Sequence, residues 1–399
     1  MTGAMARDDA AGAPADTAMR PTVYDTPERA LLREQVARFV AREVEPHADA
    51  WERDGFVPRA LLRQLGALGW LGLTVPEAYG GADADAITNF AFAEALSRST
   101  YGGFVVTVLV HTDMASPHLV RAGTHAQKAR WLPGIVRGEI VSAIAVTEAN
   151  AGSDVARIRT SAQRDGTDWV LDGSKMFITN GVHADVYFVA ARTAPLAAGS
   201  RGVSMFIVEK GTPGLAVGQV LDKSGWRSSD TAELVFDGCR IPGENLLGGE
   251  DEGFRALMHN FQRERLALGA MALGNMSSSL SLALAHVRSR EAFGGVLWQR
   301  EAIRQKLALL DARREAVRAF AYHCAWLVSQ DGDCVREISQ LKALAGELAN
   351  DVAYGCQQCY GGMGYIRETA IERLWRDARI LSIGGGATEV MLEEAAKRL

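Results

Sequence analysis

The sequence predicts an α+β protein in three parts: an N-terminal α-helical domain, a central antiparallel β domain and a C-terminal four-helix bundle. Apolar residues recur at helical spacing up to about residue 140, alternate in short runs after that, and return to helical spacing beyond about residue 250. A chain of 399 residues is also too long for one small core. We therefore expect a disordered tail at 1–22, the helical domain at 23–138, the β domain at 139–250 and the bundle at 251–399.

The helical domain is expected to begin near Thr26 and Pro27, which are typical of a helix start. Leu32, Val36 and Val40 follow at four-residue spacing and mark one apolar face. The residues before this helix are rich in Ala, Gly, Asp and Thr and contain no apolar run, which predicts a disordered tail and excludes a signal peptide.

Short β-rich runs define the central domain, with Gly, Pro or Asp between them. They favour an antiparallel barrel-like or sandwich-like arrangement rather than alternating βα units. The β-rich runs are 169–171, 186–189, 203–208 and 233–236. Four longer segments with helical periodicity then predict the bundle, and they are 254–288, 300–328, 334–355 and 371–399.

Composition excludes several classes of function. The net charge is −5 and the basic residues are scattered, so no nucleic-acid partner is expected. No apolar stretch is expected to be long enough to cross a membrane. Five sparse cysteines indicate reduced thiols and a cytoplasmic protein. The spacing of Cys356 and Cys359 would suit a redox or metal site, but no second pair completes one, so no metal is expected and buried helix thiols are the better interpretation.

Two distant segments have the composition of one ligand site. Residues 147–154, TEANAGSD, combine hydroxyls with small residues, so backbone N–H groups can approach a planar ring or a phosphate. Residues 175–181, KMFITNG, place a hydroxyl beside an aromatic residue in the alternation expected at the end of a strand.

Glu264 is a candidate general base. Leu257, Phe261, Leu268 and Met271 form an apolar stripe at helical spacing, and Glu264 lies on the same stripe. A carboxylate on a buried face is costly unless it is paired or functional, and burial would raise its pKa toward neutrality. The neighbouring Arg265 points about 100° away around the helix and is no natural partner on that face. A satisfied polar core residue, or a different helix register, would explain the same pattern.

The two segments together resemble the flavin-contacting signatures of the acyl-CoA dehydrogenase family. Residues 290–294, REAFG, are similar to the family's turn that reaches the FAD of a neighbouring subunit. Residues 358–364, QCYGGMG, are similar to its segment at the FAD diphosphate and adenosine. The four segments occur in the family's order with matching gaps, and the resemblance covers the chain from about residue 26 to its end.

Carried over position by position, the resemblance implies a set of FAD-contacting residues and a set at the acyl thioester. Ser153 belongs to both sets, and Arg265 would help to position the substrate. The implied FAD contacts are Ala145, Val146, Thr147, Gly152, Ser153, Phe177, Ile178, Thr179, Arg290, Phe293, Gln358, Gly361, Gly362, Thr388 and Glu389. The implied substrate contacts are Ser153, Phe261, Arg265, Gly385 and Gly386.

The position of the base separates branches of this family. Most members carry a Glu near the C-terminus, where this chain has Gly385, which cannot do acid–base chemistry. The chain resembles the isovaleryl-CoA and long-chain branches, which place the base on the first bundle helix in a Glu-Arg-Leu sequence, and Glu264 begins that sequence here. Glu389 is the rival carboxylate, although it looks more like a flavin-contacting position.

The resemblance implies FAD-dependent dehydrogenation of an acyl-CoA thioester to the trans-2-enoyl-CoA. Glu264 would take the α-proton while the β-hydrogen leaves as hydride to flavin N5. The enzyme would serve fatty acid β-oxidation, pass its electrons to an electron-transferring flavoprotein and form a homotetramer, or at least a dimer. Alternatives are a carrier-protein thioester dehydrogenase or an oxidase on the same fold, and a catalytically silent homologue. Acyl chain length and branching are not predicted.

Overall fold

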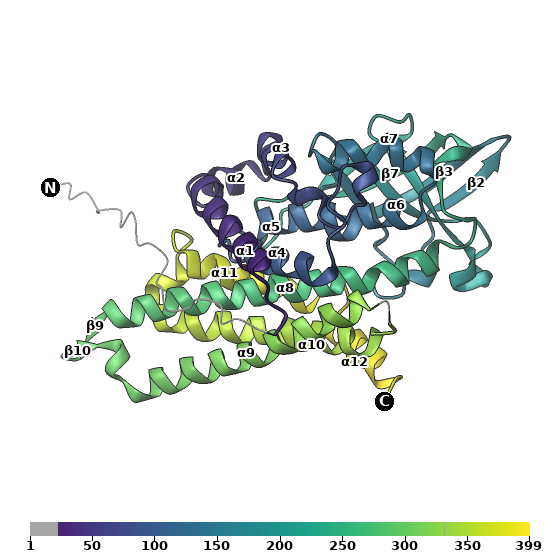
Figure 1. Ribbon diagram of the computed structural model, residues 1–399. Coiled ribbons are helices and arrows are strands. Elements are labelled where there is room, and N and C mark those ends of the chain that lie inside the picture. Colours follow the sequence, from purple (N-terminus) through teal and green to yellow (C-terminus); the bar gives the residue numbers. More distant parts are fainter. Residues whose placement is uncertain (1–22, 331) are drawn as a thin grey trace.

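The computed structural model describes residues 23–330 and 332–399, so the expected disordered tail lies outside the described residues. A helical domain and a β domain lie side by side along one flank of a long helical bundle (Figure 1). This is the three-part α+β architecture that the periodicity predicts.

The N-terminal domain is a cluster of short helices. The first begins where the sequence predicts, because the Thr26 hydroxyl accepts a hydrogen bond from the backbone N–H of Arg29 and Pro27 occupies the first turn. The helices are α1 (Pro27–Phe39), α2 (Ala48–Asp54), α3 (Arg59–Ala67), α4 (Ala86–Leu96), α5 (Gly102–Leu109), α6 (Ser116–Ala122) and α7 (His125–Val136), with single turns η2 (Val40–Val44), η3 (Trp70–Gly72), η4 (Glu77–Tyr79) and η5 (Val110–Ala115).

The β domain is one sheet in the order β6-β7-β3-β2-β4-β5-β8, with β1 paired to β4. Most neighbours are antiparallel as predicted, but β1 runs parallel to β4 and β2 meets β4 in a short parallel contact. The β2–β3 hairpin lies between β1 and β4 in sequence and supplies the long connection that a parallel pair needs. The strands are β1 (Ser142–Ala145), β2 (Ser161–Asp165), β3 (Asp168–Thr179), β4 (Val186–Arg192), β5 (Val203–Glu209), β6 (Leu215–Val220), β7 (Thr231–Ile241) and β8 (Leu246–Leu247), with turns η6 (Val155–Arg157), η7 (Leu196–Gly202) and η8 (Gly243–Asn245).

The C-terminal domain differs from the prediction in its last element. The expected single helix at 371–399 is two helices, because Gly385 and Gly386 adopt positive φ and form a loop between them. The elements are α8 (Gly253–Ser289), β9 (Glu291–Ala292), β10 (Gly295–Val296), η9 (Leu297–Gln299), α9 (Glu301–Ser329), α10 (Val335–Gln357), η10 (Gln358–Tyr365), α11 (Ala370–Ala378), η11 (Arg379–Ser382) and α12 (Thr388–Ala396).

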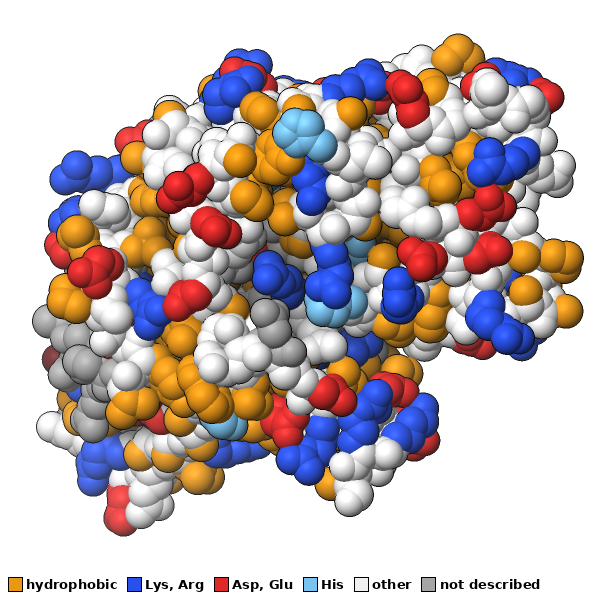
Figure 2. Space-filling view, turned by 45° about the vertical axis from the view of Figure 1, so that its right-hand side comes forward, with side chains coloured by type: hydrophobic (Ala, Val, Ile, Leu, Met, Phe, Trp, Pro, Cys, Tyr) orange, Lys and Arg blue, Asp and Glu red, His pale blue; other side chains and the backbone are white. Residues whose placement is uncertain are grey.

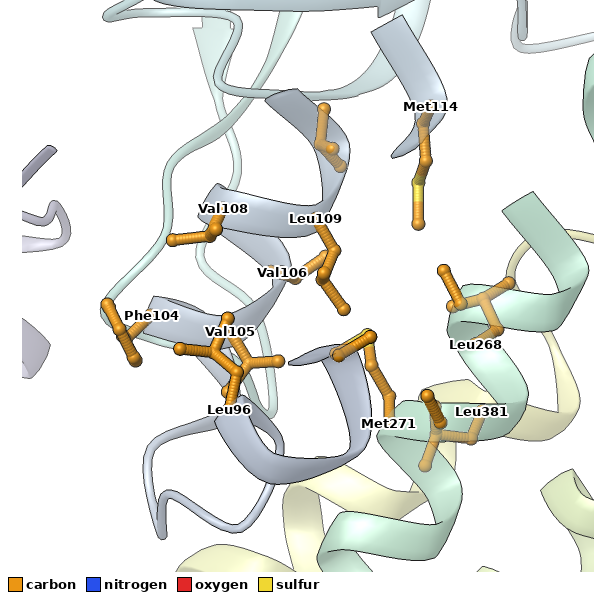
Figure 3. Packing of buried hydrophobic residues seen from close by; sticks show 14 of the residues in the cluster. Leu96, Phe104, Val105, Val106, Val108, Leu109, Met114, Leu268, Met271 and Leu381 are labelled. Atoms are coloured by element: carbon orange, nitrogen blue, oxygen red, sulfur yellow. The ribbon is translucent and has the colours of Figure 1, made fainter. Parts of the chain in front are cut away.

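Helix α8 connects all three parts. It contains an 18-residue window with a mean hydropathy of 1.2, so the expectation that no stretch could cross a membrane is wrong by length and composition. However, 89% of that window is buried inside the protein, as in the core helix of a soluble protein. Leu268 and Met271 of α8 face Leu109 and Met114 of the N-terminal domain (Figure 3). The apolar character of α8 is therefore explained by packing between the domains.

The cysteines and the surface also bear on the predictions. Cys356 is buried in α10 and Cys359 is half-buried in η10, and burial raises the pKa of both thiols. Cys356 agrees with the interpretation as a buried helix thiol, whereas Cys359 is only partly buried and lies after the helix. Figure 2 shows acidic and basic side chains interspersed over one face of the molecule.

Candidate active site

The two segments singled out in the sequence lie side by side. The backbone N–H of Met176 donates to the carbonyl oxygen of Thr147 over 2.8 Å, which joins the end of β3 to the segment after β1. Residues 147–154 and 175–181 therefore form one surface, although more than twenty positions separate them in the sequence. We call these two segments, together with Glu264 and Gly385, the inner site.

A buried ion pair holds these segments together. The Lys175 ammonium donates to the Glu148 carboxylate over 2.8 Å and to the carbonyl oxygen of Val146 over 3.0 Å. The backbone N–H groups of Arg159 and Thr160 donate to the same carboxylate. Burial lowers the pKa of Lys175 to about 8, although Glu148 opposes the shift. Burial alone would raise the pKa of Glu148, but Lys175 and the other donors hold it below its ordinary value.

A bulge in β3 turns an aromatic side chain outward. The register of β3 against β7 shifts between Lys175 and Ile178. Phe177, within this bulge, has a φ of 62° and is 62% exposed, whereas Ile178 is buried and Thr179 is half-buried. A bulky residue with positive φ is unusual, and bulges are enriched beside active sites because they redirect side chains. A β-carbon added at Gly152 would meet no heavy atom within 4 Å, so the facing segment is open as well.

The first turns of α8 lie against the β domain, where the helix contacts β5 and η7. Phe261, the substrate contact implied by the sequence, packs on a buried cluster that includes Val146 and Ala151. Phe261 precedes Glu264 by three residues, which is about one helical turn. Helix α8 therefore places Glu264 about one turn from a side chain that packs on the cluster containing Val146 and Ala151.

Glu264 has the properties expected of a titrating base. It is half-buried, and its carboxylate makes no hydrogen bond or ion pair with the described residues. Burial raises the pKa of this carboxyl to about 7, against the attraction of the nearby Arg265 and Lys342 cations. Although Arg265 points to another side of the helix, its charge still acts on Glu264.

Arg265 itself lies over the ring of Phe261, with its guanidinium carbon 5.4 Å from the ring centroid. Its Nε is buried and has no hydrogen-bond partner among the described residues. A buried donor without a partner is costly, so this nitrogen is available to a bound ligand. This fits the substrate-positioning role implied by the sequence.

The glycine loop before α12 faces Glu264. A β-carbon added at Gly385 would lie 3.4 Å from Glu264 Oε1 and 2.1 Å from Leu268 Cδ1. Gly385 also has a φ of 64°, which side chains rarely adopt. A side chain at position 385 would therefore project toward the Glu264 carboxylate and would overlap Leu268. Gly386, in the same loop, has a φ of 110°.

Glu389, the rival carboxylate, lies in the first turn of α12 and is exposed. The hydroxyl of Thr388 donates to the Glu347 carboxylate of α10 over 2.7 Å. Glu389 is therefore a surface carboxylate in contact with solvent, whereas Glu264 is half-buried.

The remaining predicted cofactor residues lie at the other end of the bundle, which we call the outer end. It comprises Arg290, Phe293, Gln358, Gly361 and Gly362, all of them exposed. Twenty-six residues separate Glu264 from Arg290, which at 1.5 Å per residue is about 39 Å along α8. Figure 1 places the β9–β10 hairpin far from the β domain. One chain therefore does not bring the inner site and the outer end together.

The two parts of the outer end lie on neighbouring elements. The rings of His286, near the end of α8, and Tyr360, in η10, stack with centroids 4.0 Å apart, and the Tyr360 hydroxyl donates to the carbonyl oxygen of Leu282. β-Carbons added at Gly361 or Gly362 would meet no heavy atom within 4 Å. Phe293 is 93% exposed at the tip of the hairpin. This end is an open surface with apolar and cationic groups.

The chain belongs to the acyl-CoA dehydrogenase family. Its residues 26–139, 143–239 and 251–399 match the family models of the acyl-CoA dehydrogenase N-terminal, middle and C-terminal domains.

Characterised relatives include the branches that the sequence indicated. The chain is 37% identical to the mitochondrial long-chain specific acyl-CoA dehydrogenase of Rattus norvegicus, over 93% of this chain and 86% of the relative. It is 36% identical to the mitochondrial isovaleryl-CoA dehydrogenase of Pongo abelii, over 91% of this chain and 86% of the relative. The crystal structure of the acyl-CoA dehydrogenase from Geobacillus kaustophilus superimposes with a TM-score of 0.91 at 35% identity, covering 95% of this chain and 99% of that one.

The chain is therefore an FAD-dependent acyl-CoA dehydrogenase. The inner site fits a flavin, because the bulge presents the exposed Phe177 beside the open loop at Gly152. Thr147 and Thr179 are half-buried on the same two segments and have hydroxyls that can bind a polar ring edge.

Three residues with evident roles were missed in the sequence. Glu148 and Lys175 form the buried pair, and Lys342 of α10 donates to the carbonyl oxygens of Leu381 and Gly386. A lysine at a buried position of a predicted strand or helix would have indicated two of these residues. Lys175 lies in a strand with alternating burial, and Lys342 lies on the buried face of α10 with Ile338 and Ala345.

Proposed function

We propose that the enzyme oxidises the Cα–Cβ bond of an acyl-CoA to the trans-2-enoyl-CoA, with Glu264 as the base that takes the α-proton. The observation that carries the proposal is the direction of Gly385, whose missing β-carbon would lie 3.4 Å from Glu264 Oε1. A base attached at position 385 and a base attached at position 264 would thus act at the same point. Because glycine at position 385 has no side chain that could act as a base, Glu264 takes this role.

The pKa of about 7 suits this role. A large fraction of the carboxyl groups is ionised at neutral pH, and the carboxylate is more basic than an exposed one. The α-proton of a thioester is too weakly acidic for a carboxylate alone, so the site has to stabilise negative charge on the thioester oxygen. The backbone N–H near Gly385 is the proposed donor, because a loop without side chains allows a close approach.

Bound FAD would supply the acceptor for the β-hydrogen, which leaves Cβ together with the electron pair of its C–H bond. The residues of the inner site would hold the ring: Phe177 would pack beside it, and Thr147 and Thr179 would offer hydroxyls to its polar edge. Ser153 would contact both the ring and the thioester, and the Arg265 Nε, which has no partner among the described residues, would be available to the substrate. Thr388 and Glu389 would complete the ring contacts.

The functional unit is proposed to be a homotetramer, or at least a dimer. The separation of about 39 Å along α8 between Glu264 and Arg290 supports this, because another subunit has to bring its outer end to the cofactor. Met363 and Tyr365 add exposed apolar surface there, at 54% and 85% exposed. Equilibrium sedimentation with and without FAD measures the assembly, and a stable monomer that retains FAD would contradict it.

The cellular setting is proposed from the family and from the thiols. The enzyme passes electrons to an electron-transferring flavoprotein and serves β-oxidation in the cytoplasm, where the free cysteines stay reduced. Cell fractionation and electron transfer to a purified flavoprotein acceptor test these parts separately.

The deciding experiment mixes the FAD-loaded enzyme with a panel of acyl-CoAs without oxygen and follows bleaching of the flavin. Glu264→Gln is expected to slow bleaching by about 10³-fold while FAD stays bound, because it removes the base and keeps the shape. Glu393→Gln, at an exposed carboxylate of α12, is the matched control and should leave the rate unchanged.

Other outcomes decide between the alternatives. Bleaching that survives in Glu264→Gln and is lost in Glu389→Gln would move the base to α12. Bleaching by a carrier-protein thioester alone would change the substrate class, and rapid reoxidation by oxygen would indicate an oxidase. Bound flavin that no thioester bleaches would indicate a catalytically silent homologue.

A further inference from the structure

A buried lysine spans the loop that faces Glu264. Lys342 of α10 is 2% exposed, and its ammonium donates to the carbonyl oxygen of Leu381 over 2.8 Å and to that of Gly386. These two carbonyls lie at either end of residues 381–386, which contain Gly385. One side chain therefore closes the glycine loop.

The loop lies directly against the backbone of α10 one turn further on. A β-carbon added at Gly346 would lie 2.5 Å from the carbonyl oxygen of Leu381, the same oxygen that accepts from Lys342. The close approach and the two hydrogen bonds fix this end of the loop to a long helix. A rigid element of this kind can hold a reacting group to within fractions of an ångström.

Lys342 also lies close enough to Glu264 and its charged neighbours to interact with them electrostatically. Arg265 and Glu264 of α8 act on its ammonium, as does Glu347 of its own helix. Glu394 and Arg398, from α12 and the residues after it, face Arg265 in turn. Burial and the like charge of Arg265 lower the pKa of Lys342 to about 8, against the opposing pull of Glu264. The positive charge of Lys342 in turn lowers the pKa of Glu264 relative to burial alone.

We propose that Lys342 is a positioning residue for the reaction. It holds the glycine loop so that the backbone at Gly385 and the carboxylate of Glu264 face the same substrate atoms, and its positive charge favours the ionised form of Glu264. The proposal rests on the proposed function, because it assigns Lys342 a role through Glu264. Lys342 acts through backbone carbonyls and through charge, and does not touch the reacting atoms.

The test compares Lys342→Met, which removes both charge and hydrogen bonds, with Lys342→Gln, which keeps an N–H donor and removes the charge. The rate of anaerobic flavin bleaching is measured against pH with the acyl-CoA that bleaches wild type fastest. In both variants the low-pH limb of the profile should move to higher pH, by about 0.5 to 1 pH unit, because Glu264 loses a nearby cation and its pKa rises. Lys342→Met should also slow bleaching at high pH by about 10- to 100-fold, because the loop is no longer held.

A second lysine provides the matched control. Lys223, in the β domain, also donates to a backbone carbonyl and to the hydroxyl of Thr231, and burial lowers its pKa to about 8 as well. Lys223→Met should leave the low-pH limb in place. FAD absorbance and thermal unfolding of each variant report folding independently of activity.

The outcomes separate this inference from the proposed function. One outcome is that Glu264→Gln loses bleaching while the low-pH limb of the pH profile stays in place in both Lys342 variants. This outcome would overturn the role of Lys342 and would leave Glu264 as the base. Retained bleaching in Glu264→Gln would overturn the proposed function, and the inference with it. If Lys342→Met fails to bind FAD, the limb measured in Lys342→Gln decides alone.

Discussion

The inner site and the outer end are built in opposite ways. At the inner site, buried groups from distant parts of one chain hold the surface in place, as Lys175 and Glu148 do with side chains 0% and 4% exposed. At the outer end, Phe293 is 93% exposed and Arg290 lies at an open helix terminus. The inner site is thus part of the fold, whereas the outer end is exposed surface. Substitutions should affect stability at the first and ligand binding or assembly at the second.

The largest expected effect comes from breaking the buried pair. Lys175→Met leaves the Glu148 carboxylate buried without its cation, and the free energy of unfolding should fall by about 3–5 kcal/mol. Urea denaturation measures the loss. The double substitution with Glu148→Gln should cost less than the sum of the two single ones, because the partners act as a unit. A loss below about 1 kcal/mol in Lys175→Met would show that the pair does not hold the inner site together.

A smaller loss is expected at the glycine loop. In Gly385→Ala, the new methyl group would meet Leu268 Cδ1 at 2.1 Å and the residue would keep a positive φ, so unfolding should become easier by about 1–3 kcal/mol. Flavin bleaching should slow with it, because the loop moves away from Glu264. Gly384→Ala is the control, since its added β-carbon would lie 3.6 Å or more from its neighbours. Equal losses in the two variants would remove the special role of position 385.

The protonation of Glu264, the proposed base, should also make the stability of the protein depend on pH. The pKa of this carboxyl is about 7 in the folded chain, against 4.5 for an unperturbed glutamate, so the fold favours the protonated form. The contribution of this carboxyl to the free energy of unfolding is fully present below pH 4.5 and is lost as pH rises through about 7. Relative to wild type, Glu264→Gln should therefore gain about 1–3 kcal/mol of stability between pH 5 and pH 8. Thermal unfolding of both proteins across this range measures the gain. A stability difference between the two proteins that stays the same from pH 5 to pH 8 would contradict the raised pKa.

The smallest effect on stability is expected at the outer end. Phe293→Ala and Arg290→Ala should change the free energy of unfolding of the protomer by less than about 0.5 kcal/mol, because both side chains are exposed. FAD affinity should nevertheless fall by about tenfold if another subunit uses this surface, since losing a contact of about 1.4 kcal/mol has that effect. Titration of the apoprotein with FAD measures it, with Val220→Ala as a control at an exposed position of the β domain. Unchanged affinity would exclude the outer end from the cofactor site.

Much of the architecture could be predicted from the sequence, because periodicity is a local property. The spacing of Leu257, Phe261 and Leu268 marks the buried face of α8 without knowledge of its partners, and it singles out Glu264 on the same stripe. The end of the bundle was harder to predict. Residues 371–399 keep a helical pattern, but the loop at Gly385 depends on backbone angles that a triple glycine permits and does not require.

The sequence by itself determined the order of the three parts and the family, and it singled out the residues that we propose carry the chemistry, since residue types and their spacing encode these. The tertiary structure alone decided which of them meet. Gly385 faces Glu264 across 121 positions of sequence, and Lys342 reaches the carbonyl of Gly386 across 44. Such contacts depend on how helices pack and on where a loop turns, so no local pattern reports them. The raised pKa of Glu264 has the same origin, because burial and the fields of Arg265 and Lys342 exist only in the folded chain.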